Sequence, residues 1–145
     1  MNTPLLTLVA MVVGTLTTNS GDDARVTYVE HQKVAAALKQ GGTLVKASDL
    51  VVEGAHRVEN GKPEWHEKQT DVFYIVDGAA TFVTGGELVD SHTIAPGQRT
   101  GTDIRGGEVR HVSPGDVIVI PAGIPHWFKE VPHSVSYYVV KVLKS

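Results

Sequence analysis

Residues 115–130 read GDVIVIPAGIPHWFKE, and this stretch decides the fold. A short apolar run, 117–120, is followed by a turn containing two prolines and a glycine, and His126 then begins a second run. A short apolar run bounded by turn residues is typical of a buried β-strand. His126 shares a face with Phe128, because alternate residues of a strand point the same way. The stretch therefore predicts two strands joined by a rigid turn, with an imidazole at the start of an apolar face.

Similar short strands and turns are expected through most of the chain. Gly contributes 15 and Pro 7 of the 145 residues, and turn signals recur after residue 60. This pattern favours an all-β sandwich or barrel. One short helix is expected over residues 30–40, where Val34, Ala37 and Leu38 share a face and Gly41 supplies a stop. Strands are expected at residues 43–46, 50–53, 71–76, 79–84, 109–112, 117–120, 126–129 and 134–142.

Composition limits the classes of function. A chain of 145 residues forms about one domain. The sequence has no Cys, which excludes disulfide scaffolds, thiolate metal sites and thiol catalysis. Its net charge is −3 and it has no basic tract, so we expect no nucleic-acid partner.

The N-terminal segment has an apolar run, residues 5–13, of the length found in signal peptides and too short to span a membrane. It predicts a signal peptide over residues 1–20, a single domain over 21–145, and a secreted or periplasmic protein. No Lys or Arg precedes the run and no A-x-A site follows it, so a first strand packed on a cytoplasmic domain remains the alternative.

A second polar group lies at residues 64–71. Glu64 and His66 are two apart and would share a strand face. The polar residues 67–70 suit a hairpin turn, after which Asp71 can face the same side as His66. Together with His126 these side chains offer two imidazoles and two carboxylates, a set that favours Mn or Fe(II), with Zn or Ni as alternatives. The other interpretation is that both histidines are ordinary barrel residues, each hydrogen-bonded to a carboxylate.

These two segments resemble the two signature motifs of the cupin family. Residues 64–78 have the spacing E-x-H-x4-D-x6-G, where the family has H-x-H, three or four residues, E-x6-G. Residues 115–130 match G-x5-P-x-G-x2-H-x3-N except at the last position. The resemblance implies a cupin barrel, also called a double-stranded β-helix or jelly roll. It also implies an internal pocket, a divalent metal held by the motif side chains, and frequent dimers.

Three positions depart from the family motifs. Glu64 replaces the first His, Asp71 replaces Glu, and Glu130 replaces Asn. Glu64 either binds the metal directly or pairs with a neighbour such as Arg57.

We therefore expect metal ligands at Glu64, His66, Asp71 and His126 in an enzyme of the oxygenase, isomerase or lyase class that acts on a small molecule. A non-catalytic small-molecule-binding protein is the alternative, because a fold does not imply catalysis. A weaker third idea is an interaction module that uses the apolar outer strands.

Three further expectations follow from the sequence. The runs 72–76 and 117–120 are apolar on both faces, which predicts a homodimer or a second covering layer. Residues 85–107 are rich in Gly, Thr and charge and are expected as a mobile hairpin, or as a loop in which Arg99 and Arg105 meet an anionic ligand. The remaining histidines lack such a motif and are expected at the surface: His31, His56, His92, His111 and His133.

Overall fold

The computed structural model describes residues 25–145. The predicted signal peptide lies outside the described residues, so export stays a prediction. The elements are α1 (His31–Gln40), β1 (Gly42–Lys46), β2 (Leu50–Arg57), β3 (Glu64–His66), β4 (Gln69–Gly78), β5 (Ala80–Thr84), β6 (Glu87–Val89), β7 (His92–Ala95), β8 (Gln98–Thr100), β9 (Asp103–Arg105), β10 (Glu108–Val112), β11 (Val117–Ile120), β12 (His126–Glu130) and β13 (Val135–Leu143). Within residues 25–145, no helix has the length and apolar character needed to cross a membrane.

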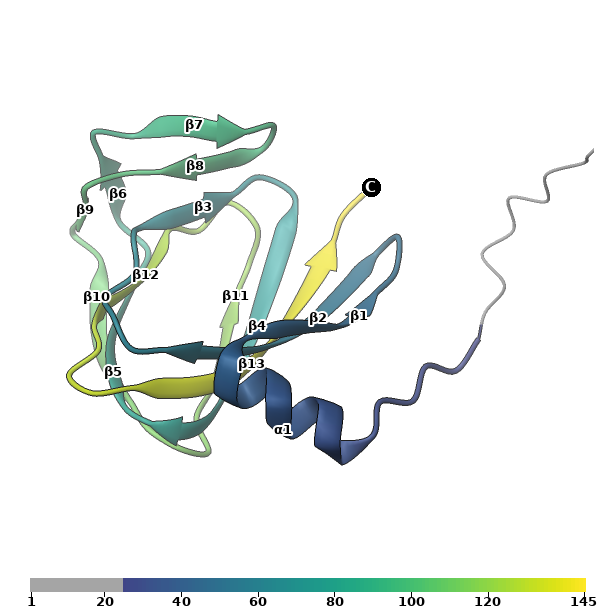
Figure 1. Cartoon of the computed structure of the whole chain (residues 1–145). Helices are drawn as coiled ribbons and strands as arrows, with labels where there is room; N and C mark the ends of the chain where they lie inside the picture. The colour runs from purple at the N-terminus through teal and green to yellow at the C-terminus, as the bar shows by residue number, and fades with distance from the viewer. Residues whose placement is uncertain (1–24) are drawn as a thin grey trace, which may run out of the picture.

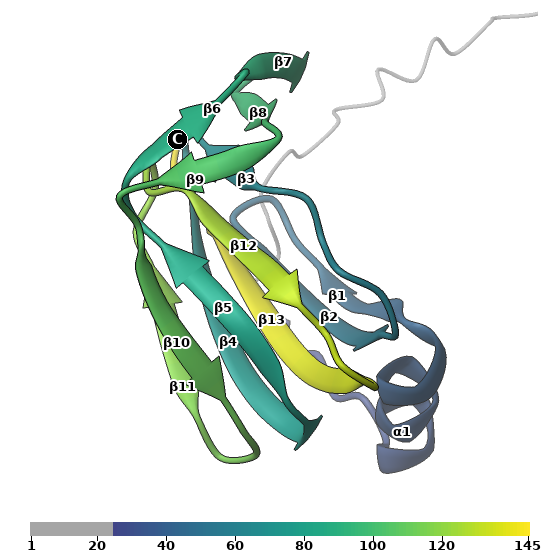
Figure 2. The ribbon, with the colours of Figure 1, turned by 90° about the vertical axis from the view of Figure 1, so that its left-hand side faces the viewer.

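Two antiparallel sheets form the body of the molecule (Figure 1). One has the strand order β1-β2-β13-β4-β11 and the other β10-β5-β12-β3-β8-β7, while β6 and β9 pair separately. Figure 2 shows β10, β5 and β12 side by side in one layer, with β4 and β13 in the layer behind. The core lies between the layers, because buried side chains from both sheets pack in one cluster that includes Phe73, Phe82, Phe128 and Tyr137. The predicted all-β architecture with one short helix is confirmed.

Strand β4 shows how the alternation of side chains builds these layers. Asp71, Phe73 and Ile75 are buried and point inward, whereas Tyr74 is exposed on the outer face. Asp71 is only 2% exposed, although it leads an otherwise apolar row. A buried carboxylate is costly unless another group compensates its charge. Asp71 is therefore expected to have cationic or hydrogen-bonding partners between the sheets.

Most predicted strands overlap observed ones, but the predicted hairpin at residues 67–70 is wrong. β3 pairs with β12 and β8, whereas β4 pairs with β11 and β13. The polar residues therefore carry the chain from one sheet to the other. A tight hairpin and a short connection between two sheets are both rich in polar residues, so the local sequence does not distinguish the two structures. The crossing nevertheless places Asp71 across the interior from β3.

Residues 85–107 form four short strands, β6 to β9, instead of one hairpin. β8 pairs with β3, with Gln98 opposite His66 and Thr100 opposite Glu64. β7 pairs with β8 and forms the edge of the six-stranded sheet. Figure 1 shows these two strands stacked above β3. The segment therefore extends the sheet beside the strand that carries two of the candidate ligands.

Helix α1 covers one end of the five-stranded sheet. Its buried residue Ala37 lies against Gly54 of β2, and a Cβ at Gly54 would be 2.7 Å from the Cβ of Ala37. Glycine at this position lets the helix approach the strand closely. Farther along the outer face, Val117 and Val119 of β11 remain 60% and 59% exposed. Among residues 25–145, the helix thus supplies only part of the covering layer that the apolar strands predict.

Candidate metal centre

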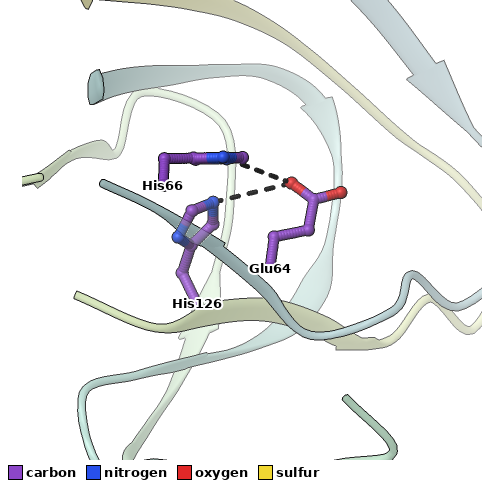
Figure 3. A group of neighbouring side chains, drawn as sticks. All are labelled: Glu64, His66 and His126. Carbon is purple, nitrogen blue, oxygen red and sulfur yellow. Dashed lines mark ion pairs between the residues drawn. The ribbon is translucent and has the colours of Figure 1, made fainter. Parts of the chain in front are cut away.

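Four side chains from three strands converge between the sheets. Glu64 and His66 project from β3, His126 from the neighbouring β12, and Asp71 from β4 of the opposite sheet. His126 and Glu64 are paired residues in the β12–β3 register. Figure 3 shows that Glu64, His66 and His126 point toward one another. The convergence predicted from the sequence is therefore present in the structure.

The distances are close to those around a single ion. Glu64 Oε2 lies 3.7 Å from the Nε2 atoms of both His66 and His126. Asp71 Oδ2 lies 3.5 Å from Nε2 of His66 and 3.3 Å from Nε2 of His126. One ligand atom of each of Glu64, His66 and His126 lies within 4.8 Å of the other two. Asp71 is not part of that group of three, although its Oδ2 lies nearer to both Nε2 atoms than Glu64 Oε2 does.

Hydrogen bonds at Nδ1 orient both imidazoles. Nδ1 of His126 lies 3.2 Å from the backbone oxygen of Ile124, which can only accept, so Nδ1 carries the proton. Nδ1 of His66 lies 2.6 Å from Oε1 of Gln98 and donates in the same way. In the neutral rings, Nε2 is then the unprotonated nitrogen, and both Nε2 atoms face the carboxylates. This is the tautomer that histidine ligands of metals adopt when a second group holds the other nitrogen.

Nε2 of His126 is buried and has no hydrogen-bond partner among residues 25–145. Asp71 and Glu64 lie near it, but their oxygens do not have hydrogen-bond geometry. Ion pairs between the histidines and these carboxylates are present, but they leave Nε2 of His126 without a well-formed hydrogen bond. A cation between the nitrogen and the oxygens would satisfy both, and imidazole and carboxylate donors suit a divalent metal.

The electrostatics of the cluster reflect strong coupling between the rings and the acids. Burial lowers the pKa of His126, but Asp71 and Glu64 outweigh burial and raise that pKa to about 9. Burial raises the pKa of Glu64, but His126 and His66 outweigh burial and hold that pKa well below its usual range. Glu64 is therefore ionised at neutral pH. Without a metal, His126 carries a proton that a metal ion would have to displace.

Asp71 has a second hydrogen-bond partner. Gln69 Nε2 donates to Asp71 Oδ1 over 2.6 Å. This leaves Oδ2 directed at the histidines and fixes the orientation of the carboxylate. Gln69 and Gln98 thus support the cluster from opposite sheets, a role that the sequence did not reveal, because neither residue belongs to a spaced motif.

A cavity of about 590 Å³ adjoins the cluster. Glu64, His66 and Asp71 lie in its wall. Its volume falls in the range of small-molecule sites. Residues of both sheets complete the wall, including Arg57, Phe73, His92, Arg99, Thr100, Tyr137 and Lys141.

Residues near the cluster can be compared with what the sequence indicated. His92 is exposed, as expected, and also lines the cavity from β7. Glu64 forms its ion pairs with the two histidines, and no pair with Arg57 is present among the described residues. Arg99 lines the cavity as the substrate-loop interpretation proposed, whereas Arg105 is absent from its wall.

The sequence matches the family model described as Cupin over residues 14–143. The chain belongs to the cupin family. The match includes both motifs and every residue of the cluster. No protein with a curated description matches this cupin.

Solved structures show the same fold at low sequence identity. This cupin is similar to BH2720 of Bacillus halodurans, with 14% identity, a TM-score of 0.59 and 86% of each chain covered. It is also similar to a predicted oxalate decarboxylase of Thermotoga maritima, with 13% identity, a TM-score of 0.52, and 72% of this chain and 79% of that chain covered. A third is the DMSP lyase DddQ of Ruegeria pomeroyi DSS-3, with 15% identity, a TM-score of 0.51, and 71% of this chain and 46% of that chain covered.

Proposed function

We propose that this cupin binds one divalent metal ion and is an enzyme that acts on a small molecule in the adjoining cavity. His66, His126 and Glu64 would hold the metal, with Asp71 as the fourth ligand. The observation that carries the proposal is the convergence of two correctly oriented Nε2 atoms on two carboxylates. Mn or Fe is favoured because the set contains two carboxylates, and Zn or Ni would also accept these donors.

The residues around the proposed metal have different roles. Gln98 and the backbone oxygen of Ile124 hold the imidazoles in the ligand tautomer. The side chain of Glu64 is 47% exposed and lies at the cavity, where its ionised carboxylate would face both the metal and a bound molecule. Asp71, almost fully buried, is better suited to holding charge than to exchanging protons. When bound, the metal would supply a Lewis acid or a site for dioxygen.

Two similar folds give a reason to prefer catalysis over passive binding. A lyase and a predicted oxalate decarboxylase share this fold. Both names describe reactions that break bonds in small molecules. The present cluster faces a cavity of suitable size, which supports the same broad class here. Non-catalytic ligand binding remains the alternative that the test must distinguish.

Turnover assays test the enzyme proposal. The full chain, loaded in turn with Mn²⁺ and Fe²⁺, would be incubated with a panel of small organic acids and aromatic alcohols. Dioxygen uptake and product formation would be followed by electrode and mass spectrometry. We expect turnover that His126→Ala abolishes and that His133→Ala, at an exposed histidine outside the cavity wall, retains. A ligand that binds the cavity without turnover under every metal would support the binding-protein alternative instead.

We also propose that two copies associate through the outer face of the five-stranded sheet. Val52, Val140, Val72 and Val119 are successive register partners across β2, β13, β4 and β11. They form an apolar row that a second copy would cover. Light scattering after size-exclusion chromatography should give a dimer mass, and Val119→Lys should give a monomer. Val109→Lys, on an exposed position of the other sheet, is the matched control. A wild-type monomer at micromolar concentrations would contradict the proposal.

A further inference from the structure

Arg57, the last residue of β2, differs from the other cations in the cavity wall. Lys62 and Arg99 are exposed, so water solvates their charges. Lys141 Nζ forms an ion pair with Glu53 Oε2 at 2.7 Å. Arg57 is partly buried, its Nε is inaccessible and has no hydrogen-bond partner, and no acidic residue in the range 25–145 forms an ion pair with it. A partly buried cation without an acidic partner favours an anion from outside the protein.

The surroundings of Arg57 hold its guanidinium in place. Cζ lies 5.4 Å from the centre of the Phe128 ring, an arrangement that stabilises a cation. On another side is Gly61, where a Cβ would be 3.2 Å from Nη1 of Arg57. Gly61 is itself fixed, because its N–H donates to Phe128 O and its carbonyl accepts from Trp127 Nε1, both over 2.8 Å. The side chain therefore occupies a prepared site, which reduces the entropy lost when a ligand binds.

Tyr137 adds a neutral donor beside Arg57. Burial raises the pKa of the Tyr137 hydroxyl, while the nearby Arg57 guanidinium lowers it, and burial outweighs the guanidinium. The hydroxyl therefore stays protonated at neutral pH and can donate a hydrogen bond. Tyr137 lines the same cavity, and its ring stacks on Phe128 with centroids 4.8 Å apart. A cation and a neutral donor side by side suit a singly charged oxyanion.

Arg57 also lies near the candidate metal ligands. A void of about 30 Å³, with room for about one water molecule, is lined by Arg57, Tyr137, Glu64 and His126 among others. Arg57 and Glu64 both line the larger cavity as well. A small ligand can therefore reach the guanidinium and the metal cluster at the same time.

We propose that Arg57 binds the carboxylate of a small organic acid and thereby sets the substrate class of the site. This inference rests on the proposed function and extends it. A guanidinium pairs with a carboxylate through two parallel hydrogen bonds. A phosphate dianion fits less well, because Glu53, Glu64 and Asp71 already line the cavity. Among the described residues, Arg57 is the one cation of the wall that is neither exposed nor in an ion pair.

Calorimetric titration of the full chain tests this assignment. The probes are lactate and pyruvate, their neutral amides, and methyl phosphate, each titrated with and without Mn²⁺. We expect the acids to bind wild-type protein about tenfold or more tightly than their amides, because a charge-assisted pair is lost in the amide. Arg57→Gln should remove that preference and leave Mn²⁺ affinity within about threefold of wild type, because no proposed ligand changes.

Two further variants keep the test decisive. Arg105→Gln removes an exposed cation that is absent from the cavity wall and should leave the acid preference intact. Gly61→Ala keeps the charge of Arg57 but crowds Nη1, so it should weaken acid binding without changing net charge. Circular dichroism and thermal unfolding would confirm that each variant is folded.

The outcomes separate this inference from the metal proposal. The Arg57 proposal would be overturned if wild type and Arg57→Gln bound the acids equally, or if methyl phosphate bound more tightly than the acids. It would also be overturned if wild type bound neither acid up to 10 millimolar, roughly the upper end of weak specific binding. Failure of wild-type protein to bind Mn²⁺ or any other divalent metal would instead overturn the proposed function. The Arg57 comparison made without metal would still give a result in that case.

Discussion

Replacing Gln98 by leucine removes the acceptor of His66 Nδ1 without touching a proposed ligand. In the wild type this hydrogen bond is 2.6 Å long and part-buried. The Gln98→Leu variant would leave the Nδ1–H of His66 without its partner, at a cost of about 1–3 kcal/mol. The ring can avoid that cost by moving its proton to Nε2, where the carboxylates of Glu64 and Asp71 lie 3.7 and 3.5 Å away. A metal would then have to displace this proton.

The tautomer change weakens metal binding, because binding must restore the tautomer whose Nδ1–H has no partner. A free-energy loss of 1–3 kcal/mol corresponds to about 5- to 150-fold in affinity. Loss of a group that orients a histidine ligand lowers metal affinity by about 10- to 100-fold in general. We therefore expect Gln98→Leu to bind Zn²⁺ and Mn²⁺ about 10- to 100-fold more weakly than wild type, as measured by competition with a fluorescent chelator at pH 7.5.

Matched variants isolate the effect of the acceptor. Gln98→Glu keeps an oxygen acceptor and should retain metal binding, whereas His92→Ala changes the same cavity without touching the cluster. The reasoning would be refuted if Gln98→Leu bound both metals within twofold of wild type while remaining folded. In that case the orientation of His66 would not matter to metal binding.

Two other predictions concern packing and pH. Gly54→Val should lower the free energy of unfolding by about 1–3 kcal/mol in urea titrations, because a Cβ there meets the Ala37 Cβ at 2.7 Å. Gly42→Ala, whose Cβ would lie 3.8 Å from the same atom, should be nearly neutral, and equal effects would contradict this packing account. In metal-free protein the raised pKa of His126 stabilises the fold fully below about pH 6.5, and this contribution is lost as the pH rises through about 9. The free energy of unfolding should therefore decrease over that interval, and His126→Gln should flatten the slope; an unchanged slope in the variant would show that His126 is not responsible.

Local patterns in the sequence were sufficient to predict the helix, the four clustered residues and most strands outside residues 85–107, where β6 to β9 were missed. The apolar run 117–120 matched β11 at both ends, because an apolar run between turn residues has few alternative structures. It was expected to be buried, but Val117 and Val119 are exposed. The helix differed by one residue at its start. Asp71 and His126 were recognised because each is a polar residue at an otherwise apolar strand face, which is rare unless the position has a function. His66 was recognised by its two-residue spacing from Glu64, which places both on one strand face.

Pairing between distant strands could not be predicted in the same way. The hairpin expected at residues 67–70 is a crossing between sheets, since polar composition indicates a turn but not its destination. Gln98 was missed because it supports His66 only through the β8–β3 register. Arg57 was considered only as a partner for Glu64, and its burial without an acidic partner among residues 25–145 is a property of the folded chain.

Elemental analysis of the full chain, purified without chelator and without a nickel column, tests the metal site most directly. The metal-to-protein ratio would be measured by inductively coupled plasma mass spectrometry after reloading with Mn²⁺, Fe²⁺ or Zn²⁺ and gel filtration. The site described above predicts about one ion per chain, in line with one cluster of four donors, and its loss in both His66→Ala and His126→Ala. Wild-type protein that retains no metal, or single variants that retain as much as wild type, would contradict it.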